Sequence, residues 1–287
     1  MPALSAQLCQ DLTNRHLTAG RTDRATLWAH MAVHAAPSSA DAWAALGAAY
    51  KQQHRWLAAQ QASQQAVRLD PTHQQAWTTI GFAATARWDG ELAMSAWQAL
   101  GVDQLHHDAI HTPFEQQEHV QVHFQTEFGP ELVNAQRLGA ATAVLIGIPT
   151  PASGRRCGEV VLLNDLFGQT YMHYNTLIRA FQMQAVLHPS RRSTWHAVVK
   201  LDWEDHMTDL GEHTSWSRAL AHRWFNATVP RVENPWNTDF SGNPPRHVNL
   251  AVSAERIDDV LAFLSKWLAA RPNRVLHSLQ QGLPMDR

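Results

Sequence analysis

Two groups of imidazole and carboxylate side chains have spacings that could support chemistry. The first group lies within one short segment and consists of His106, His107, His111, Glu115 and His119. If this segment were helical, residues 107, 111 and 115 would share one face and could bind a metal ion. Pro113 falls inside the segment and interrupts that helix. Because the chain contains 18 histidines spread over its whole length, we predict no metal site here.

The second group, Asp202, Glu204 and His206, directly follows a predicted strand. Carboxylates and an imidazole at the end of a strand could act as general acid and base, or hold a divalent metal. These three residues are therefore the catalytic candidates of an alternative hypothesis, a metal-assisted hydrolase. The simpler interpretation, which we favour, is that the acidic residues precede a helix and interact with its positive amino-terminal dipole.

The usual sequence signatures of enzymes are absent. The chain has no phosphate-binding Walker loop, no dinucleotide-type glycine run, no nucleophile elbow, no His-Glu-x-x-His and no paired CxxC. Cys9 and Cys157, the two cysteines, are far apart and do not predict a disulfide framework or a thiolate metal site. The sequence thus favours a role without catalysis, and we expect no cofactor.

The composition indicates a folded protein of two domains. The chain has 287 residues, and 23 basic and 25 acidic side chains give a net charge of −2. This balance provides no general attraction for nucleic acid or for anionic lipid. No stretch approaches 18 continuous apolar residues, and residues 1–16 do not resemble a secretory leader. We therefore expect a cytoplasmic protein without a membrane span, whose oligomeric state the sequence leaves open.

A repeat of 34 residues organises the first third of the chain. Tryptophan recurs at 43 and 77, alanine at 25, 59 and 93, and proline at 37 and 71. In the middle unit, Trp43, Leu46 and Tyr50 form one helical stripe, and Gly47 allows a second helix to approach. That second helix, predicted over 56–69, presents small alanines and ends before Pro71.

The neighbouring units repeat this pattern less completely. The third unit contains Trp77, Ile80, Gly81, Ala84, Ala93 and Trp97, and the first contains Cys9, Leu12, His16, Ala25 and Ala32. Over roughly residues 6–104 the chain resembles the tetratricopeptide repeat family. The resemblance implies an α-solenoid of three helical hairpins, whose first helices line a concave groove that binds peptides or partner domains. The groove positions are Gln10, Asn14, Lys51, Gln75, Thr78 and Phe82.

One subset of this family binds the terminal carboxylate of chaperones through Lys, Arg and Asn side chains in the groove. Here Ala45, Gln75 and Thr79 occupy positions where those side chains would be needed. Without several cations, a peptide carboxylate loses its charge-assisted hydrogen bonds. We therefore predict a neutral or amphipathic extended segment as the partner, or alternatively the protein's own second domain.

Beyond the repeats we predict a linker or capping segment at 105–118, an α/β or α+β domain with a mixed sheet at 119–275, and a tail at 276–287. Apolar runs and alternation predict strands at 119–128, 141–148, 159–163, 194–201 and 248–252. The strands at 141–148 and 159–163 should form a hairpin. Apolar spacing predicts helices at 171–187, 206–225 and 254–270, the last capped by Ser253.

These features together predict a protein-interaction adaptor or regulatory protein, in which the repeats recruit a partner to a second domain of unknown role. The enzymatic alternative requires the acidic and histidine side chains of the second domain to converge in a pocket. The adaptor hypothesis instead requires an exposed surface on the repeats, which we expect around Phe82.

Overall fold

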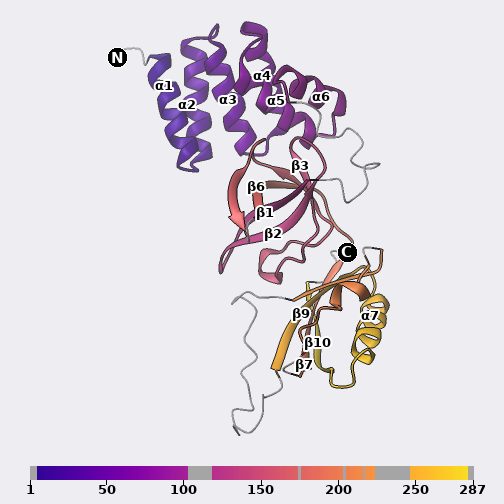
Figure 1. Cartoon of the computed structure of the whole chain (residues 1–287). Helices are drawn as coiled ribbons and strands as arrows, with labels where there is room; N and C mark the ends of the chain where they lie inside the picture. The colour runs from indigo at the N-terminus through magenta and orange to yellow at the C-terminus, as the bar shows by residue number, and fades with distance from the viewer. Residues whose placement is uncertain are drawn as a thin grey trace. The chain divides into compact units, whose positions relative to one another are not determined.

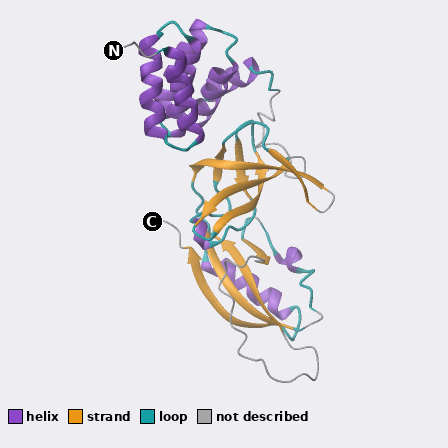
Figure 2. Ribbon diagram, turned by 90° about the vertical axis from the view of Figure 1, so that its left-hand side faces the viewer, coloured by secondary structure: helices purple, strands orange, loops and turns teal. Residues whose placement is uncertain are grey.

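The computed structural model describes residues 5–102, 118–173, 176–202, 205–215, 217–223 and 246–283. The chain forms two compact units (Figures 1 and 2). The helical unit comprises Met1–Gln117 and Leu138–Thr142, and the strand-rich unit comprises Glu118–Arg137 and Ala143–Arg287.

The described part of the helical unit contains six helices, as the sequence predicts. They are α1 (Ala6–Thr18), α2 (Thr22–Ala35), α3 (Ala40–Gln52), α4 (Trp56–Leu69), α5 (Gln74–Ala86) and α6 (Gly90–Ala99). The side chains of Ser5, Ser39 and His73 each accept a hydrogen bond from the backbone N–H three residues later, and so cap α1, α3 and α5. These caps are also 34 residues apart, so the repeat extends to the helix termini.

The 34-residue period has direct physical contacts behind it. The indole Nε1 of Trp43 donates to the carbonyl of Pro37, and Trp77 donates in the same way to Pro71, each over 2.8 Å. The turns after α1, α3 and α5 contain Gly20, His54 and Trp88, all with φ between 57° and 68°. This left-handed residue closes each helix and turns the chain toward the next.

Small residues let neighbouring helices approach closely. A Cβ on Gly81 would lie 2.4 Å from the Trp97 ring, and one on Gly47 would lie 2.1 Å from Ser63 Oγ. Ala25, Ala29 and Ala49 are fully buried in the cluster between the first two pairs of helices. Shape complementarity of small side chains therefore holds these helices together, rather than large apolar ones.

The first sheet of the strand-rich unit closes on itself. It contains β1 (His119–Thr126), β2 (Gly129–Arg137), β3 (Thr142–Leu145), β4 (Val160–Leu163), β5 (Gln169–His173) and β6 (Thr176–His188), in the order β1-β2-β3-β4-β6-β5. β1 also pairs with β6 in parallel, while β1–β2, β2–β3 and both other β6 pairings are antiparallel. The sheet is therefore mixed, and Val122, Phe124 and Phe181 fill its interior.

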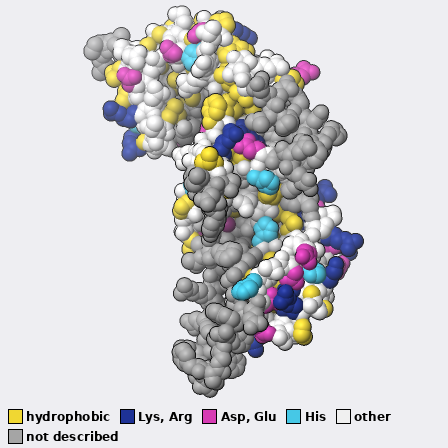
Figure 3. All heavy atoms as spheres, viewed as in Figure 1, with side chains coloured by type: hydrophobic (Ala, Val, Ile, Leu, Met, Phe, Trp, Pro, Cys, Tyr) yellow, Lys and Arg dark blue, Asp and Glu magenta, His cyan; other side chains and the backbone are white. Residues whose placement is uncertain are grey.

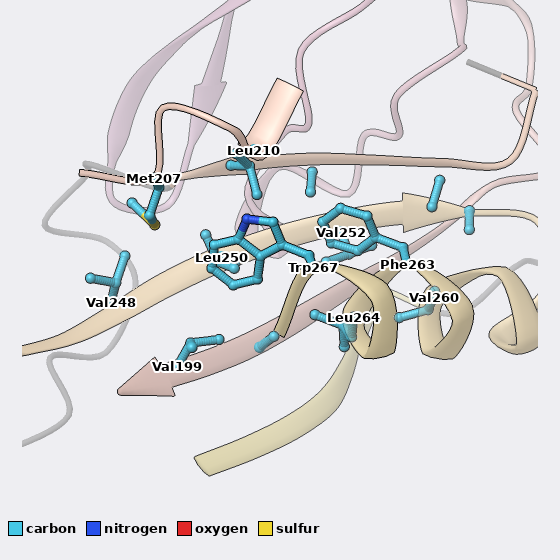
Figure 4. Close-up of a cluster of buried hydrophobic side chains, with 14 of the residues drawn as sticks. Val199, Met207, Leu210, Val248, Leu250, Val252, Val260, Phe263, Leu264 and Trp267 are labelled. Carbon is cyan, nitrogen blue, oxygen red and sulfur yellow. The ribbon is translucent and has the colours of Figure 1, made fainter. Parts of the chain in front are cut away.

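The second sheet is antiparallel in its described pairings and is covered by one helix. It contains β7 (Ser193–Leu201), β8 (Ala219–Arg223), β9 (Arg246–Ala254) and β10 (Val275–Leu283), in the order β10-β7-β9-β8. Helix α7 (Ile257–Ala269) packs Val260, Leu264 and Trp267 against this sheet (Figure 4). Two short 3-10 helices, η2 (Pro151–Ser153) and η3 (Leu210–His213), lie in the loops.

Several predicted elements of this unit are confirmed, namely the strands corresponding to β1, β3, β4, β7 and β9, and the helix corresponding to α7. The neighbouring positions of β3 and β4 confirm the predicted hairpin. The helix predicted over 171–187 is wrong, because β5 and β6 occupy that segment. Leu177 is 69% exposed while Phe181 is 1% exposed, so the apolar spacing did not mark one buried helical face.

Three further details differ from the sequence-based expectation. The segment predicted as a helix over 206–225 contains η3 and β8 instead. Ser253 does not cap α7, which begins after Arg256; it is buried in β9 and accepts a hydrogen bond from Arg192 Nε. Residues 276–283 are not a tail, because β10 pairs with β7.

Candidate functional site

The predicted partner-binding residues lie on α1, α3 and α5. Asn14 and Gln75 are exposed, and Gln10, Lys51 and Thr78 are partly exposed. We call these five residues the polar face of the first helices. On the side of the molecule drawn in Figure 3, charged side chains of the helical unit are scattered among neutral ones. This distribution agrees with the mostly uncharged surface that the sequence predicts.

Phe82 does not belong to this surface. It is fully buried, its ring packs edge to face on Trp97 with centroids 5.4 Å apart, and Lys51 Nζ lies 4.6 Å from its ring centroid. The prediction of an exposed apolar patch around Phe82 is therefore wrong. The close approach of α6 at Gly81 brings Trp97 over the phenyl ring, and the Lys51 side chain is the part that reaches solvent.

Polar contacts between successive first helices organise this region. Gln10 Nε2 donates to Ser39 Oγ over 3.4 Å, and His73 Nε2 lies 3.0 Å from Asp41 Oδ1. Since Nδ1 of His73 accepts from the N–H of Ala76, its Nε2 carries the proton and donates to Asp41. The sequence reasoning missed these links, although the 34-residue spacing of the caps was a signal that could have revealed them.

The acidic candidates of the hydrolase hypothesis are placed differently from one another. Asp202 is exposed and accepts a hydrogen bond from Asn273, His206 is exposed, and Glu204 lies outside the described residues. Their neighbour Asp205 is buried instead. Its carboxylate accepts two hydrogen bonds from Arg274, at 2.6 and 3.1 Å.

Arg274 also holds a second carboxylate, that of Asp209, with hydrogen bonds of 2.6 and 2.9 Å. Its guanidinium lies 4.1 Å from the ring centroid of Trp267. Hydrogen bonds from Arg274 lower the pKa of both Asp205 and Asp209, so both stay ionised. These carboxylates are bound in ion pairs, and this is an arrangement for stability, not for proton transfer.

Among the described residues, no group of three or more His, Cys, Asp or Glu side chains is arranged to hold a metal ion. Residues 106–115 of the histidine-rich segment lie outside the described ranges, and His119 is the first residue of β1. Within the same ranges, no helix has the length and apolar character needed to cross a membrane.

The fold of the helical unit is similar to that of solved structures. No family model matches the chain, and no curated protein is similar to it in sequence. The Arabidopsis OM64 TPR domain is 16% identical with a TM-score of 0.33, and the match covers 34% of this chain and 83% of that domain.

Two further structures match the same share of the chain. The second TPR of Spaghetti (RPAP3), bound to the HSP90 peptide SRMEEVD, is 22% identical with a TM-score of 0.34, covering 35% of this chain and 94% of that one. The TPR2B domain of yeast Sti1, in a complex with pHsp70, is 18% identical with a TM-score of 0.32, covering 33% and 75%. With tryptophans, caps and turns all repeating every 34 residues, the helical unit is a tetratricopeptide-repeat segment of a longer chain.

Proposed function

We propose that the chain is a protein-interaction adaptor or regulatory protein of the cytoplasm. Its module of three helical hairpins, over roughly residues 1–104, captures a segment of a partner protein and thereby localises or controls the strand-rich unit. The observation that supports this best is the polar face of the first helices. It presents solvent-accessible polar side chains from three successive repeats.

The chemistry of this face favours an extended, mainly neutral segment. Asn14, Gln10 and Gln75 carry amides, which can both donate to and accept from a peptide backbone. Lys51 is the single cation of the five, and its ammonium already lies over the Phe82 ring. A partner with one acidic residue would suit this arrangement, whereas an acidic cluster would lack counter-charges.

A peptide-selection experiment tests the proposal. The full chain is immobilised, a displayed library of random peptides is selected on it, and the affinity of a selected peptide is measured by fluorescence anisotropy. We expect Asn14→Ala combined with Gln75→Ala to weaken binding roughly tenfold, because two hydrogen bonds of about 0.7 kcal/mol each are lost. The peptide SRMEEVD should bind far more weakly than the selected peptide.

Gln61→Ala is the matched control, because Gln61 is also an exposed glutamine but lies on α4, a second helix. Its affinity should equal that of the unaltered chain. If the double variant binds as tightly as the control, the polar face is not the binding surface and the proposal fails in this form.

A further inference from the structure

A second candidate site is a pocket of about 560 Å³ on the six-stranded sheet of the strand-rich unit. Its walls come from β1, β2, β5 and β6 and from the loop between β4 and β5. Six of the nine residues that line it are polar, namely His123, Asn164, Asp165, Gln169, Thr170 and Gln182. The pocket is independent of the polar face of the first helices.

The strand register explains why these side chains meet. His123 of β1 lies opposite Leu132 of β2 on one side and Gln182 of β6 on the other. Their neighbours Val122 and Phe181 are buried in the interior of the sheet. Because side chains alternate along a strand, His123, Leu132 and Gln182 form a row on the outer surface.

The loop that walls the pocket is held in place by several contacts. Asp165 Oδ1 accepts from the N–H of Phe167 at 2.9 Å and of Gly168 at 2.5 Å. Arg137 Nη2 donates to the carbonyl of Leu166 at 2.8 Å. Gly168 has φ +66°, and a Cβ there would lie 2.8 Å from the Ala180 carbonyl oxygen. The loop is thus preformed, which lowers the entropic cost of binding a ligand.

Asn164 joins this loop to β6 through its backbone and its side chain. Its N–H donates to the Gln182 carbonyl at 3.0 Å, and its Oδ1 accepts from the Gln182 N–H at 3.2 Å. The Asn164 amide therefore keeps its two N–H donors for a ligand. The side chains of His123, Gln169 and Gln182 make no hydrogen bond to any other residue that the structure describes.

The character of the lining selects the class of ligand. Pockets for drug-like molecules are mostly apolar with a few polar groups, and this one has the opposite balance. No lysine or arginine lines it, so a phosphate or carboxylate would find no counter-charge. Amide, imidazole and hydroxyl side chains can both donate and accept, as a neutral ligand rich in hydroxyl groups requires.

Apolar side chains stand close to these polar groups. Leu132 lines the pocket and is 51% exposed, and Phe167, in the walling loop, is 73% exposed. Such surfaces suit the C–H faces of a sugar ring, while the polar groups suit its hydroxyls. We propose that this pocket binds a neutral saccharide of one or two rings.

Ligand-observed saturation-transfer NMR on the full chain tests this proposal, with D-glucose, D-galactose, N-acetylglucosamine, cellobiose and chitobiose as probes. The best probe is then titrated by calorimetry. We expect at least one probe to bind with a Kd of about 1 mM or tighter, the affinity a small polar ligand can reach. Gln169→Leu and Gln182→Leu should each weaken it at least tenfold.

Gln121→Leu is the matched control, because Gln121 lies on β1 beside the pocket, bonds to Asn134 and does not line the pocket. It should leave the Kd unchanged, and thermal unfolding confirms that each variant is folded. The proposal is overturned if no probe gives a transfer signal, or if both pocket variants bind as the control does. Displacement of the bound probe by inorganic phosphate would likewise overturn it, because the site would then be an anion site.

Discussion

Gly81 shows how a single residue controls the packing of the repeats. A methyl group there would overlap the Trp97 ring, which is itself 7% exposed and held against Phe82. Gly81→Ala should therefore lower the free energy of unfolding by about 1–3 kcal/mol, although alanine is the better helix former. Urea unfolding followed by circular dichroism at 222 nm measures this change.

Gly90→Ala is the control for this prediction. Gly90 begins α6, and a Cβ there would have no neighbour within 4 Å. This substitution should leave stability unchanged or raise it slightly. Equal stability of the two variants would show that Trp97 does not need the space at Gly81.

Arg274 carries the second prediction at the residue scale. Its side chain is 0% exposed and its partner Asp205 is 6% exposed. Arg274→Met leaves that carboxylate buried without a counter-charge, so we expect a loss of about 3–5 kcal/mol at pH 7. Arg256→Met removes an ion pair whose members are 73% and 69% exposed, and it should cost less than about 1 kcal/mol.

The effect of Arg274 should depend on pH. Because the pKa of Asp205 and of Asp209 is lowered in the folded state, their contribution to stability is complete above the unfolded pKa of about 3.9. It is lost as the pH falls further through the folded pKa values. The difference between the unaltered chain and Arg274→Met should thus shrink between pH 5 and pH 2. A difference that stays constant over this range would contradict the role of these ion pairs.

At the scale of elements, β10 is the part of the second sheet that the sequence analysis did not recognise. It pairs with β7 along nearly its whole length, from Val275 opposite Lys200 to Leu283 opposite Thr194. Its Leu276 and Leu279 pack against the core beneath α7. A chain that ends at residue 274 should therefore lose the cooperative unfolding of the strand-rich unit.

Tryptophan fluorescence reports on this unit, because Trp267 is fully buried in its core. Thermal unfolding of the chain truncated after 274 should begin at a lower temperature, with emission already shifted to the red. Truncation after 283 keeps all of β10 and is the control. If both truncated chains unfold like the full chain, β10 adds nothing to this core.

At the scale of the whole molecule, the helical unit should fold without the strand-rich unit. The described caps, turns and buried clusters of its six helices are made by residues between Ser5 and Val102. We therefore predict that a fragment of residues 1–104 shows helical circular dichroism and one cooperative thermal transition. A fragment that remains unfolded would contradict the predicted boundary at 104.

A shorter fragment tests whether the repeats depend on one another. Residues 1–69 lack α5, which buries Ala76 against Ala44 and Ala66. Because each repeat is stabilised mainly by its neighbours, this fragment should unfold at a lower temperature than residues 1–104. Equal midpoints would show that the third pair of helices adds no stability.

The sequence alone determined the six helices and their repeat. Their signal is local: Trp43, Gly47 and Pro71 act within one or two neighbouring helices, and the same spacing occurs again 34 residues later. The chemistry of the face followed as well, because exposed polar positions on a regular helix can be counted along the chain. The burial of Phe82 did not follow, since it depends on where Trp97 of another helix lies.

In the strand-rich unit, tertiary structure decided far more. The segment 176–188 has apolar residues at spacings compatible with a helix, but β6 obtains its backbone hydrogen bonds from β1, β4 and β5, which are distant in sequence. The same long-range pairing brings His123 beside Gln182 and builds the proposed saccharide pocket. Side chains nearly 60 positions apart become neighbours only through strand register, and no local pattern in the sequence encodes that register.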